Sequence, residues 1–434
     1  MAAPSDGSPG LRKELGTRDV FVAGVALVVA STTLVSDFQG YFALGASFAM
    51  AILIAFVINL LLGLSASELA VAFPRAGAIY EYGRDAFGGT VGKLVGLFLG
   101  LTFVGMFVLA GPGETSAGAF GLQALFNTES GINWFILVLV VLALVPNILG
   151  IKITAWVNVA LLTGMLLIRW FFGLAGFLGF SDAGGWSSSN LDAGGPGAFD
   201  WFGSDGLLAG ALILAFWTFV GIEFVCSLTE EVREPRKAMP RGIIIGLVVI
   251  LATSWLMGLG VAGTAPDEGA WADIALGEPA CNDSCPQLVV GEVMFGGFGR
   301  GLMALASVFA TLGSLSVAFA ALPRIIFGVA RNGQLFGPQV SSFFARVHPR
   351  WGTPVNATVL FAVAATVLAL RSSDVVDWIF SGAYVWILLY IAYHVVAFAD
   401  RLIHPHRHQL FGPWFLAVAH ARGKGEAQRH KNTN

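Results

Sequence analysis

The sequence predicts an all-α membrane protein with about ten transmembrane helices, because its composition and its long apolar runs both indicate a lipid surrounding. Of the 434 residues, 56% are hydrophobic and only 12% are charged, and the mean hydropathy is +0.76. A water-soluble chain of this length needs more polar surface. Apolar runs of about 20 residues recur along the chain, which is the length that crosses a hydrocarbon core of about 30 Å.

Each run is expected to form a helix, because backbone amides in lipid must be satisfied inside their own segment. The runs also lack the alternating pattern of barrel strands. In order, the predicted helices span residues 20–43, 45–67, 92–120, 133–149, 154–178, 206–229, 242–262, 293–321, 354–370 and 375–398.

Lysine and arginine occupy alternate gaps between these runs. The cation-rich gaps contain Arg12, Lys13, Arg18, Arg75, Arg84, Lys93, Lys152, Arg233, Arg236, Lys237, Arg241, Arg324, Arg331, Arg346, Arg350 and Arg401. The opposite gaps hold only Arg300 and Arg371 as cations, and they carry acids such as Asp182 and Asp267. By the positive-inside rule both termini face the cytoplasm, and we expect a multi-pass protein of the plasma membrane with no nucleic-acid partner.

The predicted helices divide into two sets of five, residues 20–178 and 206–398. A short cytoplasmic segment, 1–19, precedes them, a Gly/Ser/Asp-rich outer linker, 179–205, joins them, and a cytoplasmic tail, 399–434, follows. An odd number of spans in each half gives the halves opposite topology. This is the five-plus-five inverted-repeat architecture of many secondary transporters, in which the first helix of each repeat is broken near the substrate site.

Two helices contain candidate breaks. Ser31, Thr32 and Thr33 place hydroxyls in the middle of the first helix, where they compete for backbone hydrogen bonds, although such residues also join neighbouring membrane helices. The sixth helix carries Gly221 near its centre, with Glu223 beside it. A charge inside an apolar run costs at least about 2.5 kcal/mol, so this acid indicates more than close packing.

Three segments resemble the cytoplasmic motifs of the amino acid, polyamine and organocation permease superfamily. They read "SELAVAFPRAGAIYEYGRDAFGG", "FVGIEFVCSLTEEVREPRKAMPRGI" and "LPRIIFGVARNGQLF", the last followed by "HPRWGTP". The resemblance covers roughly residues 16–400. It implies the fold of the leucine transporter, secondary active transport by alternating access, and amino acids or related small amines as substrates.

The resemblance also implies a substrate site. Backbone N–H groups of the first break would bind a substrate carboxylate, and carbonyl groups of the second break would bind its amine. Aromatic side chains of the sixth helix, Trp217 and Phe219, would close over the ligand; the alternative is that they face lipid or the core. The implied substrate-binding residues are Ala30, Ser31, Thr32, Thr33, Leu34, Trp217, Thr218, Phe219, Val220 and Gly221.

The chain departs from the superfamily at points that bear on ion coupling. Where the first break is usually Gly-rich, this chain reads "ASTT". Some members carry a lysine in the fifth helix as a built-in cation, and here Arg169 is the only cation in that helix, expected to snorkel or to pair structurally. A sodium site could use oxygens of Thr311 and Ser314, so coupling to H⁺ or to Na⁺ stays open.

Charged residues support predictions about the outer vestibule and about an inner gate. Asp37 and Glu114 lie either at the outer interface or in the outer vestibule, where they would favour a cationic or zwitterionic substrate. Charges of the cytoplasmic motifs are expected to form salt bridges that stabilise one state of an inner gate, unless they only signal topology. These charges are Glu68, Arg75, Arg84, Glu230, Glu231 and Arg324.

The three cysteines and the C-terminal segment have separate expected roles. Cys226 is expected to pack as a small apolar residue, and Cys281 and Cys285 could form a local disulfide in an outer loop. The segment "HQLFGPWFLAVAH" resembles the start of an eleventh helix and gives way to a polar tail, as in a chain truncated before the end of a twelve-helix parent. The oligomeric state is left open.

The predicted function is therefore transport of an amino acid or small amine. An exchanger or an ethanolamine-like amine permease is the alternative within transport, and a non-transporting sensor or degenerate paralogue is the alternative from another class. No cluster of His, Cys or acids has catalytic spacing within the membrane segments, which disfavours an enzyme. We expect no cofactor and no metal.

Overall fold

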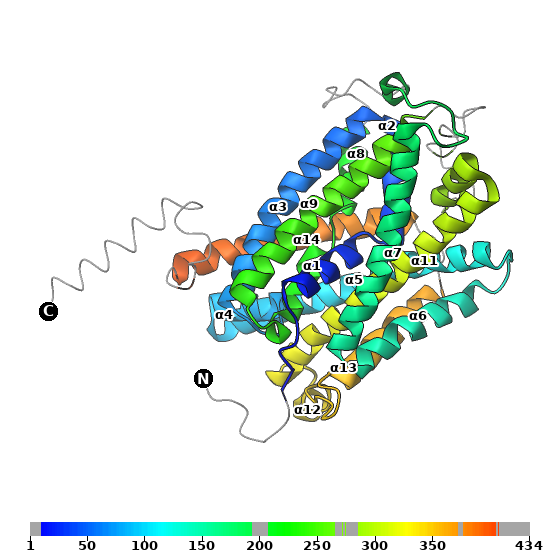
Figure 1. Ribbon diagram of the computed structural model, residues 1–434. Helices are drawn as coiled ribbons and strands as arrows, with labels where there is room; N and C mark the ends of the chain where they lie inside the picture. The colour runs from blue at the N-terminus through cyan, green and yellow to red at the C-terminus, as the bar shows by residue number, and fades with distance from the viewer. Residues whose placement is uncertain are drawn as a thin grey trace, which may run out of the picture.

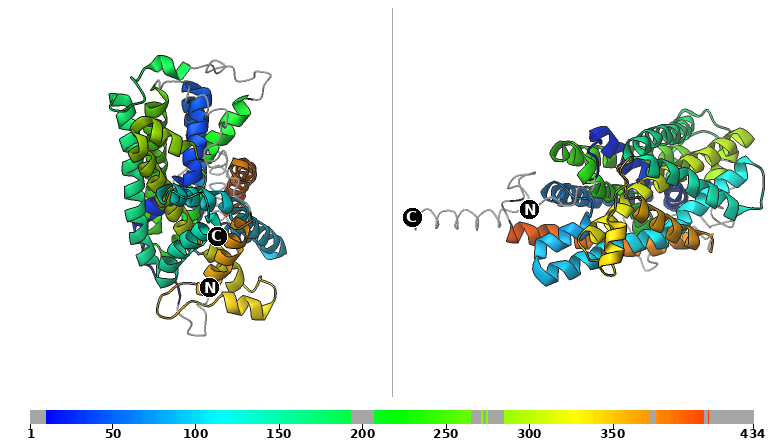
Figure 2. Two further views of the ribbon diagram at one scale, coloured as in Figure 1. Left: turned by 90° about the vertical axis from the view of Figure 1, so that its right-hand side faces the viewer. Right: turned by 90° about the horizontal axis from the view of Figure 1, so that it is seen from below.

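The computed structural model describes residues 10–192, 207–264, 271, 274, 285–371, 376–404 and 407. Apart from one isolated β-bridge between Leu15 and Val232, the regular structure of these residues is helical. Figures 1 and 2 show the helices packed side by side in one elongated bundle. The elements are α1 (Thr17–Val28), α2 (Ser31–Leu44), α3 (Ala46–Ala72), α4 (Ile79–Phe87), α5 (Gly89–Leu125), α6 (Ile132–Leu149), α7 (Ile151–Leu178), the 3-10 helix η1 (Ser188–Asp192), α8 (Leu207–Trp217), the 3-10 helix η2 (Ile222–Glu231), α9 (Pro235–Ala262), α11 (Pro286–Arg331), α12 (Pro338–Phe344), α13 (Val355–Ala369) and α14 (Val376–Ile403).

The all-α, multi-pass prediction is confirmed. Within the described residues eight helices are long and apolar enough to cross a membrane, and the bent pair α1–α2 brings the number to nine. Every predicted run coincides with a helical element. The number of spans is one lower than the predicted ten because α13 has only 15 residues, fewer than are needed to span a bilayer.

The first helix is broken, but earlier than predicted. α1 ends at Val28, α2 begins at Ser31, and the two axes differ by 58°. The break was expected at residues 30–34, whereas most of that segment forms the first turn of α2. The reason is that the Thr33 hydroxyl donates to the Val28 carbonyl oxygen at 2.6 Å, so this hydroxyl caps the end of α1 from inside the next helix.

The sixth predicted helix is interrupted where Gly221 stands. α8 ends at Trp217, residues 218–221 form a turn, and η2 continues the span as a 3-10 helix. Gly221 has φ +117°, a conformation that residues with a side chain rarely adopt. A Cβ atom there would lie 2.0 Å from Cδ2 of Leu27, so the turn also depends on close approach to α1.

Two short helices and one kink were not predicted. α4 and α12 lie in cation-rich connections, and they were not predicted because long apolar runs were the only signal used for helices. α11 is bent at Phe295 and Gly296, and it ends at Arg331, beyond the predicted end at residue 321. Pro323 and Arg324 interrupt the apolar run, but the backbone continues as a helix to Arg331, which contacts Glu81 of α4.

α1 lies in the centre of the bundle, packed against α7, α9, α11 and η2 (Figure 1). Small residues allow a close helix crossing between α7 and α9. A Cβ atom on Gly176 would lie 2.1 Å from the carbonyl oxygen of Gly260, and one on Gly260 would lie 2.2 Å from that of Gly173. Close approach of this kind replaces the hydrophobic effect as the source of helix association in lipid.

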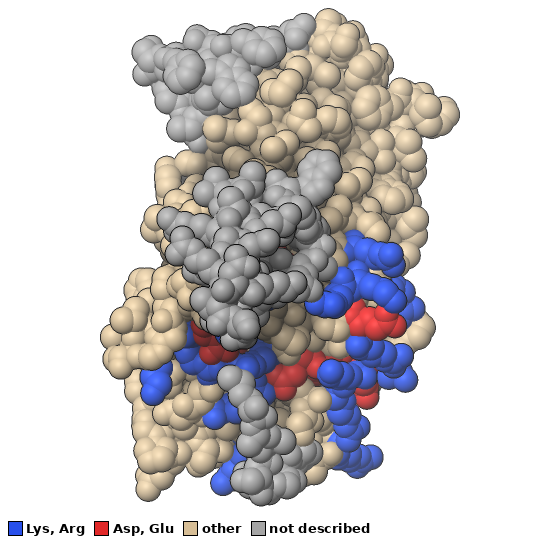
Figure 3. Space-filling model, turned by 90° about the vertical axis from the view of Figure 1, so that its left-hand side faces the viewer, with Lys and Arg blue, Asp and Glu red and all other residues tan. Residues whose placement is uncertain are grey.

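Charged side chains gather at one end of the bundle. Figure 3 shows them in the lower half of one face. We call the region formed by residues 10–16, α4, the C-terminal ends of η2 and α11, and the start of α9 the charged end. Its parts are joined by contacts such as the pair Arg331–Glu230 at 2.9 Å and the backbone bonds from Glu14 and Leu15 to the carbonyl oxygen of Glu231, each 2.9 Å.

Candidate substrate-binding site

A small cavity of about 40 Å³ lies between the two interrupted helices. This volume has room for a few water molecules, so a larger ligand requires side chains to move. Residues from α1, α2, α5, α8, η2, α11 and α14 meet around it. The lining consists of Leu27, Val28, Ala30, Thr32, Thr33, Phe107, Ala110, Gly111, Glu114, Trp217, Val220, Phe224, Ser314 and Trp386.

The predicted substrate-binding residues separate into two groups. Ala30, Thr32, Thr33, Trp217 and Val220 line the cavity. The others are buried nearby without lining it: Ser31, Leu34, Thr218, Phe219 and Gly221.

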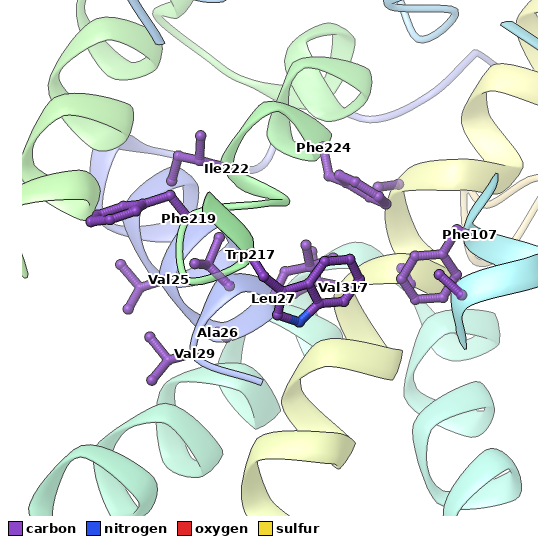
Figure 4. Packing of buried hydrophobic residues seen from close by; sticks show 14 of the residues in the cluster. Val25, Ala26, Leu27, Val29, Phe107, Trp217, Phe219, Ile222, Phe224 and Val317 are labelled. Carbon is purple, nitrogen blue, oxygen red and sulfur yellow. The ribbon is translucent and has the colours of Figure 1, made fainter. Parts of the chain in front are cut away.

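The two aromatic residues predicted to cover a ligand point in different directions. Figure 4 shows the Trp217 ring directed toward Phe107, whereas the Phe219 ring points the other way. Phe219 packs instead against Phe56 on α3, with ring centroids 6.0 Å apart. The difference follows from the turn after Trp217, which rotates the next side chains away from the cavity.

Glu114 on α5 binds the N-terminus of α2. Its Oε1 atom accepts from the Ser31 N–H group at 3.0 Å, and its Oε2 atom accepts from both the N–H group and the hydroxyl of Thr32, each at 3.0 Å. The indole N–H group of Trp217 donates to the same hydroxyl at 3.2 Å. A helix N-terminus favours a negative charge, so the carboxylate satisfies backbone donors that the break leaves unpaired.

Asp37 is also buried and does not line the cavity. Its Oδ1 atom accepts from the Thr218 hydroxyl at 2.7 Å, which joins α2 to the turn after α8. The two acids predicted for the outer interface or the vestibule are therefore both enclosed by protein. The burial of these acids could not be predicted from the sequence, because each acid is bound by an element more than 80 residues away.

Glu223 fixes a further wall of the cavity. Its Oε1 atom accepts from the indole N–H group of Trp386 at 2.5 Å. Its Oε2 atom accepts from the Tyr390 hydroxyl at 3.1 Å and from the Gly221 N–H group at 3.2 Å. Glu223, the acid that stands out inside an apolar run of the sequence, thus joins α14 to the turn at Gly221. It also orients the indole ring of Trp386 in the cavity lining.

Arg169 on α7 is buried and faces the first break. Its Nη2 atom donates to the carbonyl oxygen of Ala30 at 2.8 Å and, more weakly, to that of Val29 at 3.4 Å. The prediction that this side chain snorkels is wrong, because its relative exposure is only 1%. The alternative of a structural partner is what the geometry supports.

The two residues predicted for a coupling ion lie on α11 beside the same break. The Thr311 hydroxyl donates to the backbone carbonyl oxygen of Glu114 at 3.0 Å, and Ser314 lines the cavity. Both side chains are buried. The hydroxyl of Thr311 therefore fixes α5 to α11 in this structure.

Salt bridges join the elements of the charged end. Arg324 and Glu231, both buried, are paired by two contacts of 2.5 and 3.1 Å. On α4, burial opposes the charge of Arg84, but its hydrogen bond to Asp85 and the charge of Glu81 outweigh burial and raise its pKa. The expectation that the motif charges form salt bridges is confirmed for Glu68 with Arg401, Arg75 with Asp85, Arg84 with Glu81, Glu230 with Arg331 and Glu231 with Arg324.

The cysteine predictions are tested only in part. Cys226 is buried in η2 and its thiol contacts the carbonyl oxygen of Ala66 at 3.7 Å, in agreement with a packing role. The proposed disulfide between Cys281 and Cys285 involves Cys281, which lies outside the described residues, as does the C-terminal segment from residue 408 onward.

Several lining residues were missed by sequence reasoning. Phe107, Ala110 and Gly111 lie in α5, and Phe224 and Trp386 come from η2 and α14. Apolar membrane helices have hydrophobic side chains on all faces, so no periodicity indicates which side turns inward. The small residues next to Pro112 in "LAGPGE" were the one available signal on α5.

Together, the spanning helices, the two interruptions and the enclosed polar contacts define an all-helical, multi-pass membrane protein with a buried central cavity. Comparison with known families identifies it further. The chain belongs to the Amino acid permease family, whose sequence pattern matches residues 15–420. This is a family of transporters and not of enzymes.

Individual relatives agree with this assignment. The chain is 26% identical to cationic amino acid transporter 4 of Mus musculus over 386 residues, which is 83% of this chain and 55% of the relative. It is 26% identical to the vacuolar cationic amino acid transporter 4 of Arabidopsis thaliana over 385 residues, 84% of this chain and 59% of the relative. An uncharacterized transporter of Mycobacterium tuberculosis is 28% identical over 373 residues, 85% of this chain and 76% of the relative. The chain thus spans little more than half the length of the first two relatives.

Proposed function

We propose that the protein is a secondary active transporter that moves an amino acid or a related small amine across the membrane by alternating access. The observation that carries this proposal is the cavity between two interrupted helices, each the first helix of its predicted half. Interrupted backbone inside a membrane is tolerated where it is buried in protein or lines a cavity, and in secondary transporters such interruptions mark the substrate site.

The proposed architecture is the five-plus-five inverted repeat, with residues 20–178 and 206–398 as the two repeats and both termini in the cytoplasm. Support comes from the family membership and from the positions of the two breaks. The proposed location is the plasma membrane. The names of two Arabidopsis relatives place those proteins in the vacuole and in mitochondria.

The salt bridges of the charged end are proposed to form the inner gate. Arg324 joins α11 to η2, and Arg331 joins the end of α11 to both Glu230 and Glu81. These contacts cross between elements that must separate if the cavity is to open toward the cytoplasm. Under this proposal, these pairs hold the cavity closed on the cytoplasmic side.

Arg169 is proposed to act as a fixed cation in place of a coupling sodium ion. Its guanidinium group contacts carbonyl oxygens of the first break, which would otherwise be available to a metal cation. A guanidinium group keeps its charge throughout the physiological pH range. Uptake should accordingly be equal in Na⁺ and K⁺ buffers, and uptake that requires Na⁺ would contradict this role.

Uptake by reconstituted protein tests the proposed function. Purified protein in liposomes should accumulate radiolabelled amino acids or small amines above the level of empty liposomes. The matched control is the variant Trp217→Ala, which removes a side chain of the cavity lining; it should insert normally and lose most of this uptake. Failure of the unmodified protein to move any compound of either class, despite correct insertion, would contradict the proposal.

A further inference from the structure

We propose that a second cavity, at the charged end, binds the phosphate headgroup of an anionic phospholipid. This inference goes beyond the proposed transport function and rests on the membrane-spanning fold. The cavity has a volume of about 200 Å³ and lies between residues 14–19, the start of α7 and the connection from η2 to α9. A space of this size holds several water molecules, so a phosphate group has room there.

The charged side chains of this cavity are partly paired with one another. Arg18, Lys152 and Arg233 share its lining with two acids. Arg18 is paired with one carboxylate oxygen of Asp19 at 3.1 Å, and the other oxygen of Asp19 accepts from the Gly16 N–H group at 2.9 Å. Asp19 is therefore already bound by its own segment, and its charge is compensated by Arg18.

Two cations and one acid of the lining remain. Lys152, Arg233 and Glu14 form no ion pair with a residue that the structure describes. Their sum is one positive charge, which a phosphodiester group, with one negative charge, would neutralise. Two cations that share a cavity repel each other unless an anion lies between them. The cavity therefore favours an anion, and Lys152 and Arg233 are the side chains that would bind it.

The cavity adjoins a lipid-facing surface of α7. Trp156 lies in its lining and is 56% exposed. Exposed side chains continue from there at intervals of three or four residues, which places them on one face of the helix. These residues are Trp156, Ala160, Thr163, Leu167 and Trp170. Because α7 is long and apolar enough to span the membrane, this exposed face contacts acyl chains.

Trp156 connects the charged cavity with the lipid-facing surface. The Arg18 guanidinium group lies over its ring, with Cζ 4.7 Å from the ring centroid. Tryptophan is enriched at membrane–water interfaces, and basic pockets of membrane proteins bind anionic headgroups there. A phospholipid would place its phosphate between Lys152 and Arg233 and its acyl chains along the exposed face of α7. It would thereby join α7 to the connection between η2 and α9.

Native mass spectrometry of the full-length protein, purified in detergent and freed of lipid, tests this inference. The probes are phosphatidylglycerol, phosphatidylethanolamine and phosphatidylcholine with identical acyl chains. Phosphatidylglycerol should bind at least about tenfold more tightly than either of the other lipids, as expected for two cations at a membrane surface. Glycerol phosphate and inorganic phosphate, added at the concentration of the lipid, should not displace it because neither carries acyl chains.

Two double variants separate this cavity from the overall charge of the protein. Lys152→Gln with Arg233→Gln should remove the preference for phosphatidylglycerol. The matched control is Arg236→Gln with Lys237→Gln, which lowers the net charge equally at exposed positions outside the lining and should keep the preference.

A third variant changes the charge of the cavity in the opposite direction. Glu14→Gln removes the acid that opposes an anion and should tighten the binding of phosphatidylglycerol about fivefold. Misfolding cannot produce tighter binding, so this result would support the site directly. Unchanged or weaker binding by Glu14→Gln would contradict the inference.

The remaining outcomes also decide the inference. Equal binding of the three lipids, or tightest binding of phosphatidylethanolamine, would overturn an anionic headgroup. Displacement of the lipid by inorganic phosphate would show a site for free phosphate instead. Loss of the preference in both double variants alike would assign it to overall charge and would overturn the site. None of these results bears on uptake, so the proposed function is tested separately.

Discussion

The Nη2 atom of Arg169 lies 2.8 Å from the carbonyl oxygen of Ala30, in the two-residue break between α1 and α2. On the other side of the same break, Glu114 accepts from the N–H groups of Ser31 and Thr32. Side chains of opposite charge, one from α7 and one from α5, thus satisfy the donors and acceptors that the interruption leaves unpaired. This explains how irregular backbone is stable at the centre of the bundle.

Arg169 should be essential to stability. Arg169→Met removes the charge that faces Asp37 and Glu114 and leaves the break carbonyl groups without a donor. Loss of one member of a buried charged set costs about 3–5 kcal/mol, so the melting temperature in detergent should fall by several degrees. Arg169→Lys should recover part of the loss. The control is Arg300→Met, at a half-exposed pair, and an equal melting temperature for the Arg169 and Arg300 variants would contradict the assignment.

Gly221 should tolerate no side chain. Its φ of +117° disfavours other residues, and an added Cβ atom would meet Leu27 at 2.0 Å. Gly221→Ala should lose most of its uptake, and Gly221→Leu all of it, while both insert into the membrane. Adding Leu27→Ala to Gly221→Ala removes the collision but not the strain of the left-handed conformation. The uptake that this double variant recovers measures how much of the loss is due to the collision with Leu27. Normal uptake by Gly221→Leu would show that the ligand binds elsewhere.

The pair Arg324–Glu231 should behave as a buried salt bridge. Arg324→Met leaves a carboxylate buried without its partner and should lower the free energy of unfolding by about 3–5 kcal/mol. The double variant Arg324→Met with Glu231→Gln should recover part of that loss because no charge is left unpaired. Lys237→Met, which breaks the exposed pair with Glu234, serves as the control and should cause no measurable change. Equal melting temperatures for the single and double variants would show that the two residues are not coupled.

Much of the fold could be predicted from hydropathy and cation placement, because lipid imposes helices and the length of each run. Gly221 marked the second interruption correctly, since a glycine is the residue that a left-handed turn requires. The first break was placed too late because its position depends on one local side-chain bond and on one tertiary contact. The Thr33 hydroxyl returns to Val28, and Glu114 binds Ser31 and Thr32 from 82 or more residues away.

The cavity was harder to predict than the breaks. Glu114 was recognised as unusual, but its partners became apparent only when α5 was packed against α2. Phe107 and Trp386 belong to helices that are hydrophobic on all sides, and the inward direction of Trp386 depends on its hydrogen bond to Glu223. Phe219 was misplaced because a turn whose rotation the sequence does not specify separates it from Trp217.

In the proposed mechanism, the cavity between the broken helices opens to each side of the membrane in turn. The most direct test is thiol labelling of Ser314→Cys, a position in the lining, in a chain whose own cysteines are replaced (Cys226→Ala, Cys281→Ser and Cys285→Ser). A membrane-impermeant reagent is applied to vesicles of either orientation, with and without a transported compound. We expect labelling from both sides, protection by that compound, and faster labelling from the cytoplasmic side when Arg324→Met is added. Labelling from one side alone, or labelling that the compound does not slow, would contradict it.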